Sequence, residues 1–228
     1  SLLLASRNRI KEIDLSGNPS LSQVKLASNL LETIDVSHQP NLSWLKIDNN
    51  QLKEIDVHAN KYLYWMECGD NQLTTLKLEK NTYLQWLAAE RNNIASLDLS
   101  HNTGLQGLTI QDNKLTTESL NTIIAGLQDV NGVEITDNNR TFARILNISN
   151  MPGTKNANVA EAISKGWKVT AEVTTGISTI GDGSIVGTTE YYSIDGKRLA
   201  APSQHGVCIE RGVNADGKKT ARKIINRK

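Results

Sequence analysis

A 21-residue period is the feature of this sequence that most constrains its fold. Asparagine and leucine each return at that interval, in separate columns. The two columns are Asn8, Asn29, Asn50, Asn71, Asn92 and Asn113, and Leu21, Leu42, Leu63, Leu84 and Leu105. A fixed period of this length is typical of a solenoid, in which each repeat buries its apolar face only against its neighbours. The sequence therefore predicts a stack of similar coils.

Within one period the apolar positions follow the pattern LxxLxLxxNxL, and a second Ile/Leu-Asp-Val/Leu segment follows in most turns. In one turn these positions are Leu21, Val24, Leu26, Asn29, Leu31, Ile34 and Val36. The alternation before the asparagine is the period of a β-strand with one buried face. We expect the strands to stack in parallel about 4.8 Å apart, with asparagine amides bonding the backbone inside each bend. The second segment should be extended or a short strand on the opposite side.

This pattern resembles the leucine-rich repeat. Its 21-residue form is similar to the short repeats of secreted and surface proteins from Bacteroides-like bacteria, and the match covers residues 2 to about 115. The resemblance implies a leucine-rich repeat solenoid over residues 1–115, made of parallel β-strands with little helix inside the repeats. Because Ser1 to Leu4 align one period before Ser22 to Lys25, we expect the chain to be truncated inside a repeat, without its N-terminal cap.

The period breaks at Thr116, which predicts a different structure from there on. Residues 117–127 and 158–165 read as helices, and residues 145–148 and 167–169 read as strands. Val133, Ile135 and Asn138 match the repeat pattern and predict a strand that restores its register. The open end of a solenoid needs a capping structure whose outer face is polar. We therefore expect an α/β C-terminal cap over residues 116–176, with Trp167 filling its core.

Residues 177–228 differ in composition, which shifts to Gly, Ser and Thr and then to alternating apolar runs. Asp195-Gly196 between two such runs is a hairpin signal. The arrangement of Tyr192, Gly196 and Leu199 with the later Gly206-Val207-x-Ile209 and Lys223-Ile224-Ile225 resembles the C-terminal sorting domain of type IX secretion substrates. The resemblance implies a small all-β tail domain used for export and surface attachment. A β module that merely ends the chain is the alternative.

Tryptophan follows the same period, one place before a buried position of the strand, at Trp44, Trp65 and Trp86. Alternation puts these indoles on the outer face of the sheet, about 4.8 Å apart and within stacking range. Such a stack could serve stability alone, but tryptophan is a favoured hot-spot residue, and a contiguous exposed apolar patch usually has a partner. The predicted ligand-binding residues are Trp44, Trp65, Trp86, Lys46, Glu67, Asp48, Glu90 and Tyr64.

Other columns carry weaker functional signals. The aspartates Asp14, Asp35, Asp56 and Asp98 lack the further oxygen ligands of a calcium repeat, so we expect them to bond serine or backbone groups. Asp35, Ser37 and His38 have the residue types of a catalytic triad, but adjacent residues on an extended segment point to alternate faces and should not converge. Cys68 falls in an aliphatic column and is expected to be a small buried hydrophobe. We predict no enzyme activity, metal site or cofactor.

Composition narrows the class of protein further. The 228 residues carry 25 Lys and Arg against 24 Asp and Glu, so no global field favours nucleic acid or an acidic partner. No run approaches the ~18 apolar residues that cross a bilayer, and no signal peptide is recognisable. We expect a monomeric, non-enzymatic protein, secreted or displayed at a bacterial cell surface, that binds a protein of the host or of its own kind. Glycan binding by the same tryptophans and a structural spacer without ligand stay open.

Overall fold

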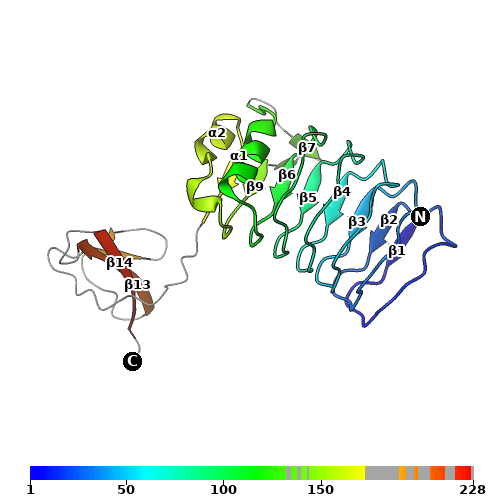
Figure 1. The fold of residues 1–228 in the computed structure, drawn as a ribbon, viewed down its shortest axis with the longest axis horizontal. Helices are drawn as coiled ribbons and strands as arrows, with labels where there is room; N and C mark the ends of the chain where they lie inside the picture. The colour runs from blue at the N-terminus through cyan, green and yellow to red at the C-terminus, as the bar shows by residue number, and fades with distance from the viewer. Residues whose placement is uncertain are drawn as a thin grey trace. The chain divides into compact units, whose positions relative to one another are not determined.

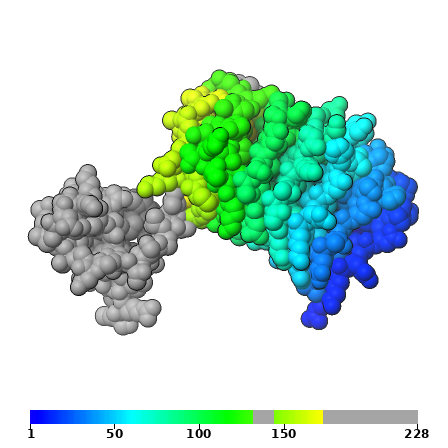
Figure 2. All heavy atoms as spheres, in the orientation of Figure 1, coloured from blue at the N-terminus to red at the C-terminus, as the bar shows by residue number. Residues whose placement is uncertain are grey.

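The computed structural model describes residues 1–131 and 144–172 with their side chains, and the backbone of the strands at 135–137, 140–142, 190–193, 198–199, 206–213 and 219–226. The chain divides into two compact units, Ser1–Thr174 and Thr175–Lys228. The first unit is a solenoid of stacked coils, with β1 at one end and the helices at the other (Figure 1). In Figure 2 these coils are consecutive bands of colour, each lying against the next.

One sheet of eight parallel strands runs the length of this solenoid. In spatial order its strands are β1 Leu2–Leu4, β2 Gln23–Lys25, β3 Trp44–Lys46, β4 Trp65–Glu67, β5 Trp86–Ala88, β6 Gly107–Thr109, β9 Ile145–Asn147 and β10 Lys168–Thr170. From β1 to β6 each residue pairs with its equivalent in the next repeat, as Leu45 does with Met66. The predicted parallel solenoid is confirmed. The second segment of each repeat, expected to be extended or a short strand, forms no strand within residues 1–115.

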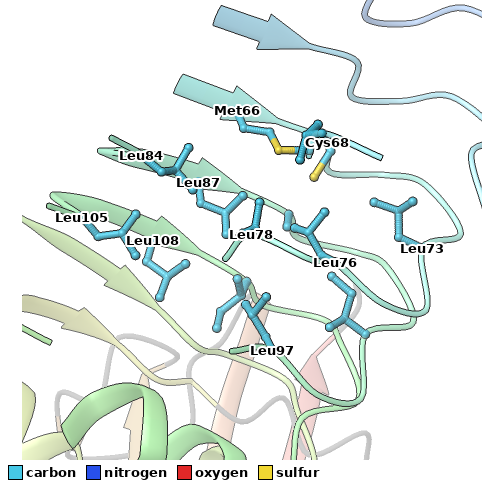
Figure 3. Packing of buried hydrophobic residues seen from close by; sticks show 14 of the residues in the cluster. Met66, Cys68, Leu73, Leu76, Leu78, Leu84, Leu87, Leu97, Leu105 and Leu108 are labelled. Atoms are coloured by element: carbon cyan, nitrogen blue, oxygen red, sulfur yellow. The ribbon is translucent and has the colours of Figure 1, made fainter. Parts of the chain in front are cut away.

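The core is the set of aliphatic columns that the strand alternation turns inward. Leu45, Met66 and Leu87 occupy the middle of consecutive strands and are fully buried. Figure 3 shows Met66, Leu87 and Leu108 side by side in this core. Cys68 is buried in the same column system, as predicted, and its burial raises the pKa of the thiol.

Asparagine side chains close the bend after each strand. The Nδ2 of Asn71 donates to the carbonyls of Ile47, Cys68 and Gly69, and its Oδ1 accepts from the N–H of Leu52. The residue just before each asparagine has a φ of 50° to 60°; these residues are Arg7, Ser28, Asn49, Asp70, Arg91 and Asp112. Non-glycine residues seldom adopt this left-handed conformation, which persists where the surroundings enforce it. Here the hydrogen bonds of the asparagine side chains hold the bend in that conformation.

A second buried ladder, which we did not anticipate, lies where each coil turns back toward the sheet. Its members are Gln39, Asn60, Asn81 and Asn102. Each side-chain amide donates to two backbone carbonyls of the preceding coil, as Asn81 does to Val57 and Asn60. These residues recur every 21 positions, so the column could have been predicted from the period of the sequence.

The repeat after Thr109 is interrupted by an insertion. Helix α1, Thr117–Gly126, begins after Thr116, whose side chain accepts from the N–H of Ser119. Strand β7, Ile135–Asp137, pairs antiparallel with β8, Arg140–Phe142, and stays outside the main sheet. The prediction that this segment restores the repeat register is therefore wrong.

The register resumes at β9 instead, where Leu146 pairs with Leu108 of β6. Leu146 and Ile148 are both buried at alternate positions, and Asn150 has the positive φ of the bend. Leu146 and Ile148 thus supply the two buried side chains of a repeat strand, and Asn150 supplies the bend that follows it. The short match around Ile135 was therefore not sufficient to place a strand in the sheet.

The remaining elements close the end of the solenoid (Figure 1). They are the 3₁₀ turn η1, Thr154–Asn156, the helix α2, Val159–Ser164, and strand β10. Trp167, just before β10, is buried, and its Nε1 donates to the carbonyl of Gln128, which follows α1, at 3.0 Å. Its expected role in the cap core is confirmed. Within the described ranges, no helix has the length and apolar character to cross a membrane.

The second unit contains a four-stranded antiparallel sheet. Its strands are β12 Arg198–Leu199, β11 Glu190–Ser193, β13 Gly206–Val213 and β14 Lys219–Asn226, in that spatial order. The hairpin turn predicted at Asp195-Gly196 lies outside the described residues. The same is true of the side chains on which the resemblance to a sorting domain depends, so that role stays a prediction.

Candidate functional site

Three tryptophans lie on adjacent strands, on the outer side of the sheet. Trp44, Trp65 and Trp86 open β3, β4 and β5 and face one another in the strand register. The ring centroids of Trp44 and Trp65 are 5.0 Å apart with an interplanar angle of 32°. Those of Trp65 and Trp86 are 4.8 Å apart and inclined by only 5°. The structure therefore brings the three indoles together as one stacked ladder, and each of them is half-buried.

Gly107 ends the ladder, because it takes the tryptophan position in β6. It pairs with Trp86, and a Cβ built on it would lie 2.1 Å from the Trp86 ring. The indole thus rests directly on the glycine backbone. The interval from Trp86 to Gly107 continues the period, so the sequence contained a signal for this position that we did not use.

The first indole of the ladder is covered by Lys25 and flanked by Tyr64. The Nζ of Lys25 lies 4.1 Å from the centroid of the Trp44 ring, a cation–π contact. Tyr64 meets Trp44 edge to face, with centroids 6.3 Å apart. Every indole therefore has a neighbour against both ring faces, and what remains open to solvent is chiefly the ring edges.

Paired charges border the ladder on one side. Lys46 forms ion pairs with Asp48, at 2.9 Å, and with Glu67. Glu67 also accepts a 2.7 Å hydrogen bond from the Nε1 of Trp65, which fixes that indole. Burial acts to lower the pKa of Lys46, but its hydrogen bonds with Glu67 and Asp48 outweigh it and raise the pKa overall. Lys46 is thus a charged anchor for both carboxylates.

A second charged group joins the coil of Trp65 to the coil of Trp86. The Nη2 of Arg91 lies 2.6 Å from Asp70 and 3.6 Å from Glu90. The hydrogen bond from Arg91 holds the pKa of Asp70 below its usual value. Glu90 also accepts from the Oγ1 of Thr109 at 3.0 Å. All eight predicted residues therefore lie on or beside one face, joined there by Lys25, Asp70, Arg91 and Thr109.

The aspartates of the opposite segment form turns. The Oδ1 of Asp35 accepts from the N–H of Ser37 at 2.8 Å, and Asp14, Asp56 and Asp98 make the same bond. The hydroxyl and the N–H of Ser37 together lower the pKa of Asp35. This confirms the expected bonding to serine and backbone. In the described part of the chain, no three His, Cys, Asp or Glu side chains are grouped to hold a metal ion.

Ser37, His38 and Asp35 do come together, which corrects the expectation that they diverge. The Oγ of Ser37 lies 3.2 Å from the Nδ1 of His38, and the same nitrogen lies 3.7 Å from Asp35. They meet because Ser37 and His38 lie in a turn rather than on an extended segment. A triad needs the serine and the carboxylate on different ring nitrogens. This exposed cluster lacks that geometry.

Among the solved structures that resemble this chain are a Listeria and a Leptospira protein. An internalin from Listeria monocytogenes matches with a TM-score of 0.53 and 26% sequence identity, over 55% of this chain and 38% of the internalin. A leucine-rich repeat protein from Leptospira interrogans matches with a TM-score of 0.53 and 22% identity, over 55% of this chain and 35% of its own length. The chain thus corresponds to little more than a third of either protein.

Comparison of the sequence itself is less informative: no protein-family model and no curated protein matches the chain. The structural comparison agrees with the parallel solenoid described above. The chain is therefore a leucine-rich repeat protein, and its solenoid is structurally similar to that of a bacterial internalin.

Proposed function

We propose that this chain is a non-enzymatic binding protein that recognises a protein partner through its tryptophan face. We use that name for the outer surface of β3, β4 and β5 formed by Trp44, Trp65, Trp86, Lys46 and Glu67. The stacked indole ladder on the solvent side of the sheet carries the proposal. Tryptophan is enriched in binding hot spots because one side chain offers a large contact area with few rotatable bonds.

The ladder is also held in place before any partner arrives. Trp65 is stacked on both sides and hydrogen-bonded to Glu67, and Trp86 rests on Gly107. Side chains that are already ordered lose little rotamer freedom on binding, which favours affinity. The ion pairs of Lys46 border the apolar strip with polar groups, as is usual for a protein interface with an apolar centre and a polar rim.

The same geometry favours a protein over a glycan as the ligand. Sugar rings bind tryptophan by lying on the faces of the indole. Here the faces contact Lys25, a neighbouring indole or the backbone at Gly107. The exposed ring edges and the adjoining charged groups suit the side chains of a protein surface.

We further propose that the protein acts outside the bacterial cell, secreted or at the cell surface, as a monomer. The resemblance of residues 177–228 to a sorting domain supports this location. Fractionation of the producing cells with an antibody against residues 1–174 tests it, and recovery only with cytoplasmic markers would refute it.

Replacing Trp65 with glutamine tests the proposed face. Gln23 occupies the same outward position in β2, so the fold already accommodates glutamine there. The probes are a displayed random-peptide library and a glycan array, each screened with the full chain. We expect the enriched peptides to bind the Trp65→Gln chain about 30-fold more weakly, the loss of a hot spot worth about 2 kcal/mol.

Tyr83→Ala is the matched control, because Tyr83 is an exposed aromatic residue that lies outside the strands. It should leave peptide binding unchanged, and thermal melts of both variants verify that they remain folded. Trp65-dependent binding on the glycan array alone would assign a glycan ligand. An absence of binding in both screens would leave a structural spacer, and either result overturns the proposal.

A further inference from the structure

Charges on and beside the tryptophan face are distributed unevenly from one end to the other. Toward its middle, Lys46 lies between Asp48 and Glu67, and toward the cap, Arg91 lies between Asp70 and Glu90. Each of these cations therefore has two carboxylates within ion-pair distance. Each group therefore offers a partner one carboxylate more than it has cations, and so carries an excess of negative charge.

Lys25 stands apart from this arrangement. Its partners across the sheet are Leu4 on one side and Lys46 on the other, an apolar residue and a like charge. Among the residues that the structure describes, no carboxylate forms an ion pair with Lys25. Its ammonium instead lies against the ring of Trp44. The N-terminal border of the tryptophan face, where Lys25 covers Trp44, thus carries a positive charge without a paired carboxylate.

A partner that covers Trp44 must also cover the ammonium of Lys25, because the two are in contact. Removing a charge from water is costly unless an opposite charge accompanies it. The cation–π contact recovers part of this cost but leaves the net charge in place. Apolar surface lies on both sides, since Leu4 is exposed on β1 and Trp44 opens β3.

We propose that the partner presents an acidic segment to this end of the face, with a carboxylate at Lys25 and an apolar side chain beside Trp44. The inference rests on the proposed function and names the chemistry of the protein partner. Electrostatic complementarity of this kind adds specificity and association rate more than affinity. Selectivity between acidic and basic ligands is accordingly the quantity to measure.

The experiment screens one displayed random-peptide library against three full-length chains: the unmodified protein, Lys25→Glu and Lys80→Glu. The two variants change the net charge equally, but Lys80 is exposed in a turn after Leu78, outside the sheet. Deep sequencing gives the Asp and Glu content of the enriched peptides. We expect an acidic excess of about twofold over the input library for the unmodified protein and for Lys80→Glu. For Lys25→Glu the excess should vanish or turn toward Lys and Arg.

Two controls separate this inference from the function on which it rests. Lys25→Met keeps the aliphatic stem over Trp44 without the charge, so it should lose acidic selectivity while peptides still bind. Peptides that need Trp65 but show no acidic excess would refute the inference and leave the proposed function standing. An acidic excess that persists in Lys25→Glu would refute it equally. A screen that enriches no peptide at all would overturn both.

Discussion

Replacing Asn71 with alanine measures how strongly the asparagine ladder joins neighbouring coils. The Nδ2 of Asn71 donates to the carbonyls of Ile47 at 3.0 Å, Cys68 at 3.1 Å and Gly69 at 3.1 Å. Its Oδ1 accepts from the N–H of Leu52 at 3.0 Å. Ile47 and Leu52 belong to the preceding coil, so the side chain bonds two coils together.

The loss of stability depends on which hydrogen bonds the partners of Asn71 keep after the substitution. The three carbonyls keep a second donor, since Asn50, Asn92 and the N–H of Asn49 also bond them. The buried N–H of Leu52 loses its partner completely, which costs about 1–3 kcal/mol. With a smaller loss at the carbonyls, we expect Asn71→Ala to lower the free energy of unfolding by about 3 kcal/mol.

Urea denaturation followed by tryptophan fluorescence measures this change, since Trp65 and Trp86 lie in the affected and adjacent coils. With an m-value of about 2 kcal/mol/M, the midpoint should fall by about 1.5 M. Asn8→Ala is the matched control, because Asn8 is exposed and, among the described residues, its side chain bonds Ala5 and Ser6 of its own coil. It should cost under about 1 kcal/mol. Equal losses in the two variants would refute the reasoning that bonds between coils make the ladder strong.

Three further predictions address other parts of the solenoid. Gly107→Ala should displace the Trp86 indole and abolish its near-ultraviolet circular dichroism coupling, because the new methyl would lie 2.1 Å from the ring; an unchanged spectrum would contradict this, and Gly126→Ala, with nothing within 4 Å, is the control. In a Cys208→Ser background, Ellman's reagent should react with Cys68 only as fast as the chain unfolds, because burial raises the pKa of the thiol; labelling in native buffer at the rate of a free thiol would contradict it. The pKa of Asp35 is lowered by the Ser37 hydroxyl, so its contribution to stability is present above its ordinary pKa and is lost as pH falls through the lower folded value. An NMR titration should show this pKa rising in Ser37→Ala, and an unchanged value would refute the assignment.

The stacking of the indoles has a consequence for both stability and recognition. Trp65 stacks on two neighbours, and such pairs contribute about 1 kcal/mol each beyond the area they bury. Part of the ladder's role is therefore structural, which the sequence analysis raised as the alternative to recognition. The melting comparison of Trp65→Gln with the unmodified chain measures that part separately from the binding of peptides.

The candidate site was predictable to the extent that it follows the period. A fixed repeat carries each column to one line along the stack, so the outward place of Trp44, Trp65 and Trp86 follows from alternation alone. The spacing of about 4.8 Å between parallel strands then puts the rings within stacking distance. The details of contact were not predictable in this way. Side-chain rotamers decide that Lys25 covers Trp44, that Glu67 bonds both Trp65 and Lys46, and that Trp86 lies over Gly107.

By itself, the sequence determined the parallel sheet, the inward aliphatic columns and the asparagine ladder of residues 1–115, because each repeat buries its apolar face only against an identical neighbour. Beyond Thr116 that local rule no longer applies, and only the tertiary structure decided which segment rejoined the sheet. Ile135–Asp137 matched the pattern but pairs with β8, whereas β9 fits against β6. The physical reason is that a strand after an insertion is selected by its packing on the last coil, and that packing depends on contacts far apart in the sequence.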